Sequence, residues 1–193
     1  MFDGTSLLAA WFCSASIAAN AAFTGLFSLR RLYKQFWSLI DEARAGASSS
    51  ARPEKLAEVL APLNDDEVSG FCEKYYEKIC DLNQWRLWGA GFVIAGGMSD
   101  DSFHYFRSWI IGKGESVFDI AMKEPGELGS HVDDPEVDNE LLEYVALTIL
   151  DKRGIKGDPR DRSARRADED PVGEPFDEDN VSGAFPKLTA LFG

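Results

Sequence analysis

Histidine, cysteine and basic side chains are all scarce in this chain. Of its 193 residues, 2 are His, 3 are Cys and 20 are Lys or Arg, against 33 Asp or Glu. So few His, and no paired Cys motif, argue against a zinc site. The resulting formal net charge of −13 disfavours binding to nucleic acid or to an anionic membrane surface. The sequence therefore predicts no metal site, no cofactor and no nucleic-acid partner.

The cysteines also indicate the compartment. Cys72 and Cys80 fall on one predicted helix, where eight residues at a rise of about 1.5 Å place them about 12 Å apart. A disulfide requires Cα atoms within about 7 Å, so these two thiols are expected to stay reduced. Unbridged cysteines are typical of a reducing environment, and the predicted location is the cytoplasm.

Familiar catalytic and nucleotide-binding motifs are missing as well. The sequence contains no Ser-His-Asp elbow, no Walker lysine after a glycine loop, no dinucleotide fingerprint and no calcium loop. With 45% hydrophobic and 27% charged residues, the composition is that of a folded globular protein. These observations favour a protein that is not an enzyme.

The one long uncharged stretch lies near the N-terminus. Residues 4–29 carry no charge, and Arg30, Arg31 and Lys34 follow them. A bilayer span needs about 20 apolar residues, and this basic flank would leave the rest of the chain in the cytoplasm. Much of the stretch is Ala, Ser, Thr and Asn, with polar and apolar stripes that suit a helix packed on protein. Residues 1–31 are thus an apolar extension with three interpretations: a non-native start, a packed helix or a membrane anchor.

Residues 32–193 have the pattern of a single helical domain. Apolar residues recur at helical spacing in seven segments, which predicts a mainly α, compact single-domain bundle of six to eight helices with irregular loops. A polar, Asp-rich loop is expected at about residues 157–183, before an apolar tail that returns to the core. The predicted helices are 34–44, a short one from Pro53, one from Asp65, 84–96, 100–111, 115–123 and 136–152, with 84–96 and 100–111 as the central pair.

Several ordered segments also form a recognisable series. They are Phe36-Trp37-Ser38-Leu39-Ile40, Trp85-Arg86-Leu87-Trp88-Gly89-Ala90, Gly96-Gly97-Met98-Ser99-Asp100-Asp101-Ser102-Phe103, Tyr105-Phe106-Arg107-Ser108-Trp109, Glu143-Tyr144-Val145-Ala146 and Phe185-Pro186-Lys187-Leu188. Over about Gln35 to Gly193 the chain resembles a bacterial family, domain of unknown function 4240. Met98 stands where the family often has Cys, and Arg86 where Asp is common. The resemblance implies a bacterial protein and brings no established activity with it.

The start of the 100–111 helix gathers most of the reactive side chains. Asp100 and His104 are four residues apart, and Asp101 and His104 three apart, so each pair can share a helix face. With Arg107 they are the candidate catalytic residues, because carboxylate and imidazole can perform acid–base chemistry or bind a divalent metal. A structural interpretation is simpler: Ser99 caps the helix, the acids meet the helix dipole, and Arg107 pairs with an acid.

Aromatic residues and Ser99 supply the candidate binding residues. Trp85, Trp88, Tyr105 and Trp109 recur at helical spacing, which predicts core positions first and an aromatic pocket second. The candidate ligand-contacting residues are Trp85, Trp88, Ser99 and Tyr105.

The favoured function is a non-enzymatic interaction or regulatory module with a protein partner. The first alternative is an enzyme or metal-dependent binding protein that uses the Ser99-Asp100-Asp101-His104-Arg107 cluster. The second is a membrane-tethered version of either, anchored through residues 4–29. The first alternative requires the cluster to converge on a pocket.

Overall fold

The computed structural model describes residues 35–133 and 137–193. Residues 38–193 form one compact unit, and only residues 35–37 are described of the chain before it. The extension predicted for residues 1–31 lies outside the described residues. Among the helices of the described ranges, none has the length and apolar character that crossing a membrane requires.

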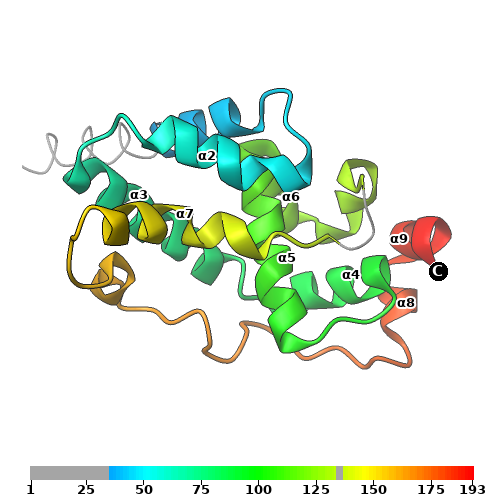
Figure 1. Ribbon diagram of the computed structural model, residues 1–193. Coiled ribbons are helices and arrows are strands. Elements are labelled where there is room, and N and C mark those ends of the chain that lie inside the picture. The colour runs from blue at the N-terminus through cyan, green and yellow to red at the C-terminus, as the bar shows by residue number, and fades with distance from the viewer. Residues whose placement is uncertain (1–34, 134–136) are drawn as a thin grey trace, which may run out of the picture. The chain divides into compact units, whose positions relative to one another are not determined.

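The fold is mainly helical, as predicted, and the described ranges contain no β-strand (Figure 1). The described ranges contain more helices than the six to eight predicted, because the C-terminal tail forms two further short helices. Residues 35–44 are helical. The α-helices that follow are α2 (Arg52–Leu60), α3 (Asp65–Asp81), α4 (Trp85–Ala95), α5 (Asp100–Gly112), α6 (Glu115–Lys123), α7 (Glu140–Lys152), α8 (Val181–Ala184) and α9 (Pro186–Phe192), with 3₁₀ turns η1 (Ser49–Ala51), η2 (Pro125–His131) and η3 (Pro159–Arg162).

Local capping signals determine where α3 and α5 begin. The Asn64 side chain accepts a hydrogen bond from the Glu67 backbone N–H, and the Glu67 carboxylate accepts one from the Asn64 N–H, both at 3.0 Å. This is the capping box that the sequence predicts for α3. Gly96 ends α4 with a left-handed φ of 67°, and Ser99 caps α5 by accepting from the Ser102 N–H at 3.2 Å.

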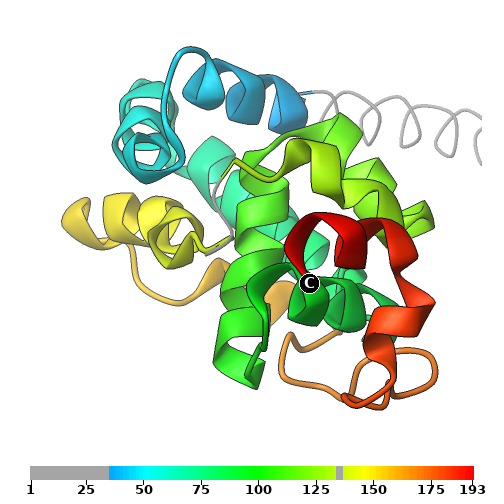
Figure 2. The same ribbon diagram turned by 90° about the vertical axis from the view of Figure 1, so that its right-hand side faces the viewer.

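The centre of the unit is α5 rather than the predicted pair of α4 and α5. Helix α5 packs against α3, α6 and α7, and Trp109 within it is 1% exposed. Helix α4 lies to one side, where its main neighbours are α9 and η2 (Figure 2). One face of α4 is therefore available to form a surface feature.

Helix α7 begins at Glu140, four residues later than predicted. Val137 has a positive φ of 40°, which is incompatible with an α-helix, so the chain cannot enter the helix before that point. Once formed, α7 packs against α2, α3 and α5. This placement brings Glu143 next to α5.

The polar loop predicted at 157–183 is irregular as far as residue 180, apart from η3 and a single bridge between Val172 and Gln84, and its last residues belong to α8, which begins at Val181. It runs along the end of α3 and past the start of α4 before α8 and α9 (Figures 1 and 2). The predicted return of the tail to the core is seen at Leu188, which is fully buried.

Candidate functional site

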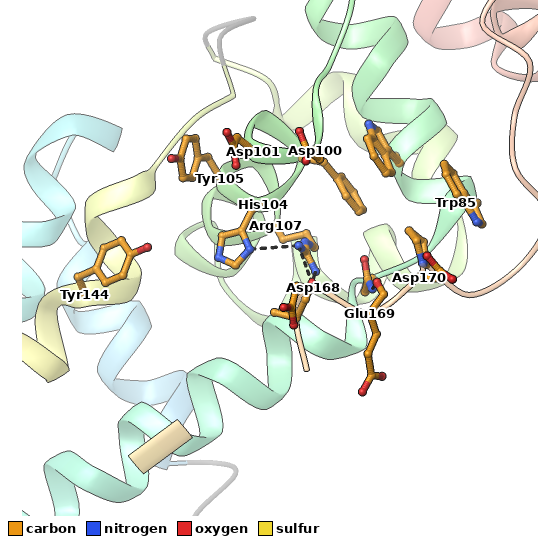
Figure 3. A pocket seen from close by; sticks show the side chains of 15 residues that line it. Trp85, Asp100, Asp101, His104, Tyr105, Arg107, Tyr144, Asp168, Glu169 and Asp170 are labelled. Carbon is orange, nitrogen blue, oxygen red and sulfur yellow. Dashed lines mark hydrogen bonds between the residues drawn. The ribbon is translucent and has the colours of Figure 1, made fainter. Parts of the chain in front are cut away.

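A pocket opens where α4, α5 and the irregular segment meet, and we call it the α4–α5 pocket. Its volume is about 510 Å³. Four structural parts contribute to its lining (Figure 3). The residues are Asn83, Trp85 and Trp88 at α4; Asp100, Asp101, Phe103, His104, Tyr105 and Arg107 on α5; Tyr144 on α7; and Ala167, Asp168, Glu169, Asp170 and Pro171.

One wall of the pocket is a stack of flat groups. The rings of Trp85 and Trp88 lie 5.1 Å apart at 3°, and those of Trp88 and Phe103 lie 4.8 Å apart at 5°. The Arg107 guanidinium continues the stack, 4.8 Å from the Phe103 ring centroid. The Trp88 indole N–H donates to the Met98 carbonyl at 3.0 Å, which ties the stack to the turn before α5. Such stacking fixes the rings and presents an apolar surface to a ligand.

Arg107 forms the base of the pocket. It is only 3% exposed, and its terminal nitrogens donate to the carbonyls of Ile79 and Ala167 at 3.1–3.4 Å. Nη2 also donates to Nδ1 of His104 at 3.1 Å. Burial lowers the pKa of Arg107 to about 10, so it stays protonated at neutral pH. Its contacts with main-chain carbonyls replace the ion pair that the sequence predicted.

The contact with Arg107 determines which tautomer His104 adopts. Because a guanidinium nitrogen can only donate, Nδ1 of His104 accepts, and the ring proton sits on Nε2. Nε2 then donates to Oε2 of Glu143 at 2.6 Å. Both ring nitrogens of His104 are therefore used by protein groups.

Glu143 connects the histidine to a further ion pair. It is 5% exposed, and its Oε1 accepts from Arg160 at 3.1 Å. Arg160 also donates to both oxygens of Asp158, at 2.7–3.1 Å. Burial acts to raise the pKa of Glu143, but the hydrogen bonds from His104 and Arg160 and the positive charge of Arg160 outweigh it and hold that pKa below its ordinary value. The network therefore keeps a buried carboxylate ionised.

The opposite wall is formed by residues 167–172, which we call the acidic segment. Its main chain is fixed at several points: the Ala167 N–H donates to the Tyr76 hydroxyl at 3.0 Å, and the Asn83 side chain donates to the Glu169 carbonyl at 2.7 Å. The backbone of Val172 forms two hydrogen bonds where α4 begins: its N–H donates to the Asn83 carbonyl, and its carbonyl accepts from the Trp85 N–H. The backbone of this segment is thus held, while Asp168, Glu169 and Asp170 are exposed.

Carboxylates dominate the charge around the pocket. Asp100 and Asp101 are exposed on one side, and the three acids of the acidic segment lie on the other (Figure 3). Arg107 is the one Lys or Arg among the lining residues, and it is buried at the base. Within the described ranges, Asp100, Asp101 and Asp170 have no basic partner within ion-pair distance. The mouth of the pocket is therefore strongly negative.

The structure brings most of the sequence-derived candidates together. Asp100, Asp101, His104 and Arg107 all line the α4–α5 pocket, as do the candidate binding residues Trp85, Trp88 and Tyr105. Ser99 does not line it and acts as the cap of α5. Trp109, the fourth aromatic candidate, belongs to the core. Among the described residues, no group of three or more His, Cys, Asp or Glu side chains is arranged to hold a metal ion.

Sequence reasoning missed Glu143, Arg160 and the acidic segment. Glu143 lies 39 residues from His104, so no local spacing connects them. The Asp168-Glu169-Asp170 run was visible, but an acidic run in an irregular stretch usually indicates a solvated loop. Its role became apparent only from its position across from α5.

The comparisons with known proteins agree with the resemblance seen in the sequence. No curated protein and no solved structure matches the chain. A family model described as "Protein of unknown function (DUF4240)" matches residues 33–152. That range contains the stacked rings, Arg107, His104 and Glu143, whereas the acidic segment and the tail lie beyond it. Since the match spans more than half of its length, the chain belongs to the family of proteins of unknown function DUF4240.

Proposed function

We propose that this protein is a recognition module whose α4–α5 pocket binds a cationic group, such as an alkylammonium or a guanidinium. The proposal is carried by the combination of a stacked aromatic wall and the four carboxylates of Asp100, Asp101, Asp168 and Asp170 around one pocket of about 510 Å³. An organic cation attached to a short apolar stem matches both features. The stem would contact the edges of the Trp85 and Trp88 rings while the charge meets the acids at the mouth.

The positions of the charges favour a cation at the mouth rather than at the base. Arg107 occupies the base, and its positive charge opposes a second cation there. Asp100 and Asp101 face the pocket from α5, and Asp168 and Asp170 face it from the acidic segment. A cation between these two sides is attracted from both directions.

An acid–base role for His104 is the alternative, favoured by its orientation against the buried carboxylate of Glu143. Both His104 ring nitrogens are already hydrogen-bonded, at 3.1 Å to Arg107 and 2.6 Å to Glu143. Catalysis would require a ligand to displace one of these partners. Ring ¹⁵N shifts of His104 that stay unchanged on ligand titration would support recognition, and a large shift would support the catalytic alternative. A cytoplasmic setting, or tethering through residues 4–29, would be compatible with either role.

The direct test compares two probes of the same shape, butylguanidinium and neutral butylurea. At low ionic strength, tryptophan fluorescence should report saturable binding of the cation only, and 0.5 M salt should weaken it. Asp100→Asn/Asp101→Asn should reduce the affinity about tenfold, because two exposed charge interactions of about 0.7 kcal/mol each are lost. Asp66→Asn is the matched control, since it also removes an acid from the first turn of a helix. Equal binding of the two probes would refute the proposal.

A further inference from the structure

Large apolar side chains are exposed beside the α4–α5 pocket. Tyr144 lines the pocket and is 38% exposed, and Leu141, three residues earlier on α7, is 63% exposed. Residues three apart on a helix share a face, so Leu141 and Tyr144 form one patch. Val172 follows the lining residue Pro171 directly and is 74% exposed.

These two apolar patches flank the negative mouth. Tyr144 lies at one end of the pocket and Trp85 at the other (Figure 3). Val172 is fixed beside Trp85, since its carbonyl accepts from the Trp85 N–H at 3.0 Å. Its backbone also donates to the Asn83 carbonyl at 2.9 Å, so its side chain is held in solvent by an anchored main chain. Across this surface, one apolar patch is therefore followed by the acidic mouth and then by the second apolar patch.

We propose that the occupant of this surface is a basic segment of a partner protein, in which a Lys or Arg side chain is flanked by apolar residues. The inference rests on the proposed function and narrows it from any cationic group to a peptide. The basic side chain would lie among the carboxylates at the mouth. Its apolar neighbours would cover Leu141 and Tyr144 on one side and Val172 on the other. A free amine satisfies the acids but leaves both apolar patches in water.

Charge complementarity indicates that the partner segment is positively charged. The carboxylates of Asp100, Asp101, Asp168 and Asp170 surround the pocket, and the whole chain carries a net charge of −13. A basic segment is attracted by both the local and the overall field, while an acidic or phosphorylated segment is repelled. The buried Arg107 does not offer a binding site for an acidic residue, because its terminal nitrogens already donate hydrogen bonds to main-chain carbonyls and to His104.

The test uses three probes and three variants of the full chain. The probes are the peptide acetyl-Leu-Ala-Arg-Ala-Leu-amide, the same peptide with neutral citrulline in place of Arg, and butylguanidinium. Calorimetry should show the Arg peptide binding about tenfold more tightly than butylguanidinium, because only the peptide covers the apolar patches. The citrulline peptide should lose about tenfold in affinity, since it no longer carries the charge.

The variants separate the apolar contacts from the charge contacts. Leu141→Ser and Val172→Ser should each weaken the Arg peptide about threefold and leave butylguanidinium unchanged. Leu191→Ser is the matched control, because Leu191 is also 63% exposed but lies on α9, which contributes no residue to this pocket. It should change neither affinity.

Two outcomes distinguish this inference from the proposed function. If butylguanidinium binds but the peptide gains nothing and both Ser variants have no effect, the pocket serves a small free cation and the peptide inference is overturned. If neither cationic probe binds wild-type protein, the proposed function itself fails.

Discussion

Replacing Glu143 with Gln tests whether the buried network under the α4–α5 pocket holds its charges as described. Glu143 accepts two hydrogen bonds, one from His104 at 2.6 Å and one from Arg160 at 3.1 Å. The Gln amide keeps the shape but has one oxygen, so its NH₂ group must face one of these donors. The variant loses the charge-assisted hydrogen bonds that the buried carboxylate accepts and leaves one buried donor without an acceptor, so we expect a loss of about 3 kcal/mol at pH 7.

The assay is urea denaturation of wild type and Glu143→Gln, followed by far-ultraviolet circular dichroism. Glu58→Gln is the matched control, since Glu58 pairs with Lys55 at the surface. Exposed pairs contribute about 0–1 kcal/mol, so this control should remain close to wild type. A Glu143→Gln effect no larger than that of the control would refute the network as a stabilising element.

The stabilisation that Glu143 provides should also depend on pH, in a direction set by its pKa. The pKa of Glu143 is below its ordinary value of 4.5, because its hydrogen bonds to His104 and Arg160 outweigh the effect of burial. As pH falls, the unfolded state therefore takes up the proton first. The stabilisation is complete above about pH 4.5 and is lost as pH falls through the folded-state pKa. The difference in unfolding free energy between wild type and Glu143→Gln should therefore become smaller below pH 4.5. A difference that grows there would contradict an ionised Glu143 in the folded protein.

Three further predictions concern packing, the acidic segment and thiol chemistry. Trp109→Ala should cost about 3–5 kcal/mol in urea denaturation, and Trp88→Ala clearly less, because Trp109 is buried and Trp88 is partly exposed. Tyr76→Phe removes the acceptor of the Ala167 N–H and should cost about 1 kcal/mol, with faster amide exchange at Ala167 measured by NMR. Burial raises the pKa of Cys72 to about 12, so this thiol should resist Ellman's reagent at pH 8 and react once urea unfolds the chain.

Local signals made part of the structure predictable. The Asn64–Glu67 capping box and the Ser99 cap are encoded within four residues, and the starts of α3 and α5 were correctly predicted. The start of α7 was not, because the positive φ of Val137 is set by surrounding structure rather than by periodicity. Trp88 was expected first in the core, since spacing alone cannot tell a core face from a pocket face.

The site could be predicted only where it lies on one helix. Asp100, Asp101, His104 and Arg107 line one pocket because helical spacing brings them together on α5, and that spacing is visible in the sequence. Glu143 comes from α7 and the acidic segment from an irregular stretch, and no sequence pattern connects either to α5. The expected ion pair of Arg107 was wrong for the same reason: its acceptors are the distant carbonyls of Ile79 and Ala167.

An NMR titration of the tryptophan indole N–H groups with butylguanidinium tests cation recognition in the α4–α5 pocket most directly. The chain has five Trp, and the Trp88 N–H is a sensitive reporter because it donates to the Met98 carbonyl. We predict saturable shifts of the Trp85 and Trp88 signals, none for buried Trp109, and none for any of them with butylurea. Trp85 and Trp88 signals that stay unmoved by the cation, or that respond equally to butylurea, would contradict cation binding in this pocket.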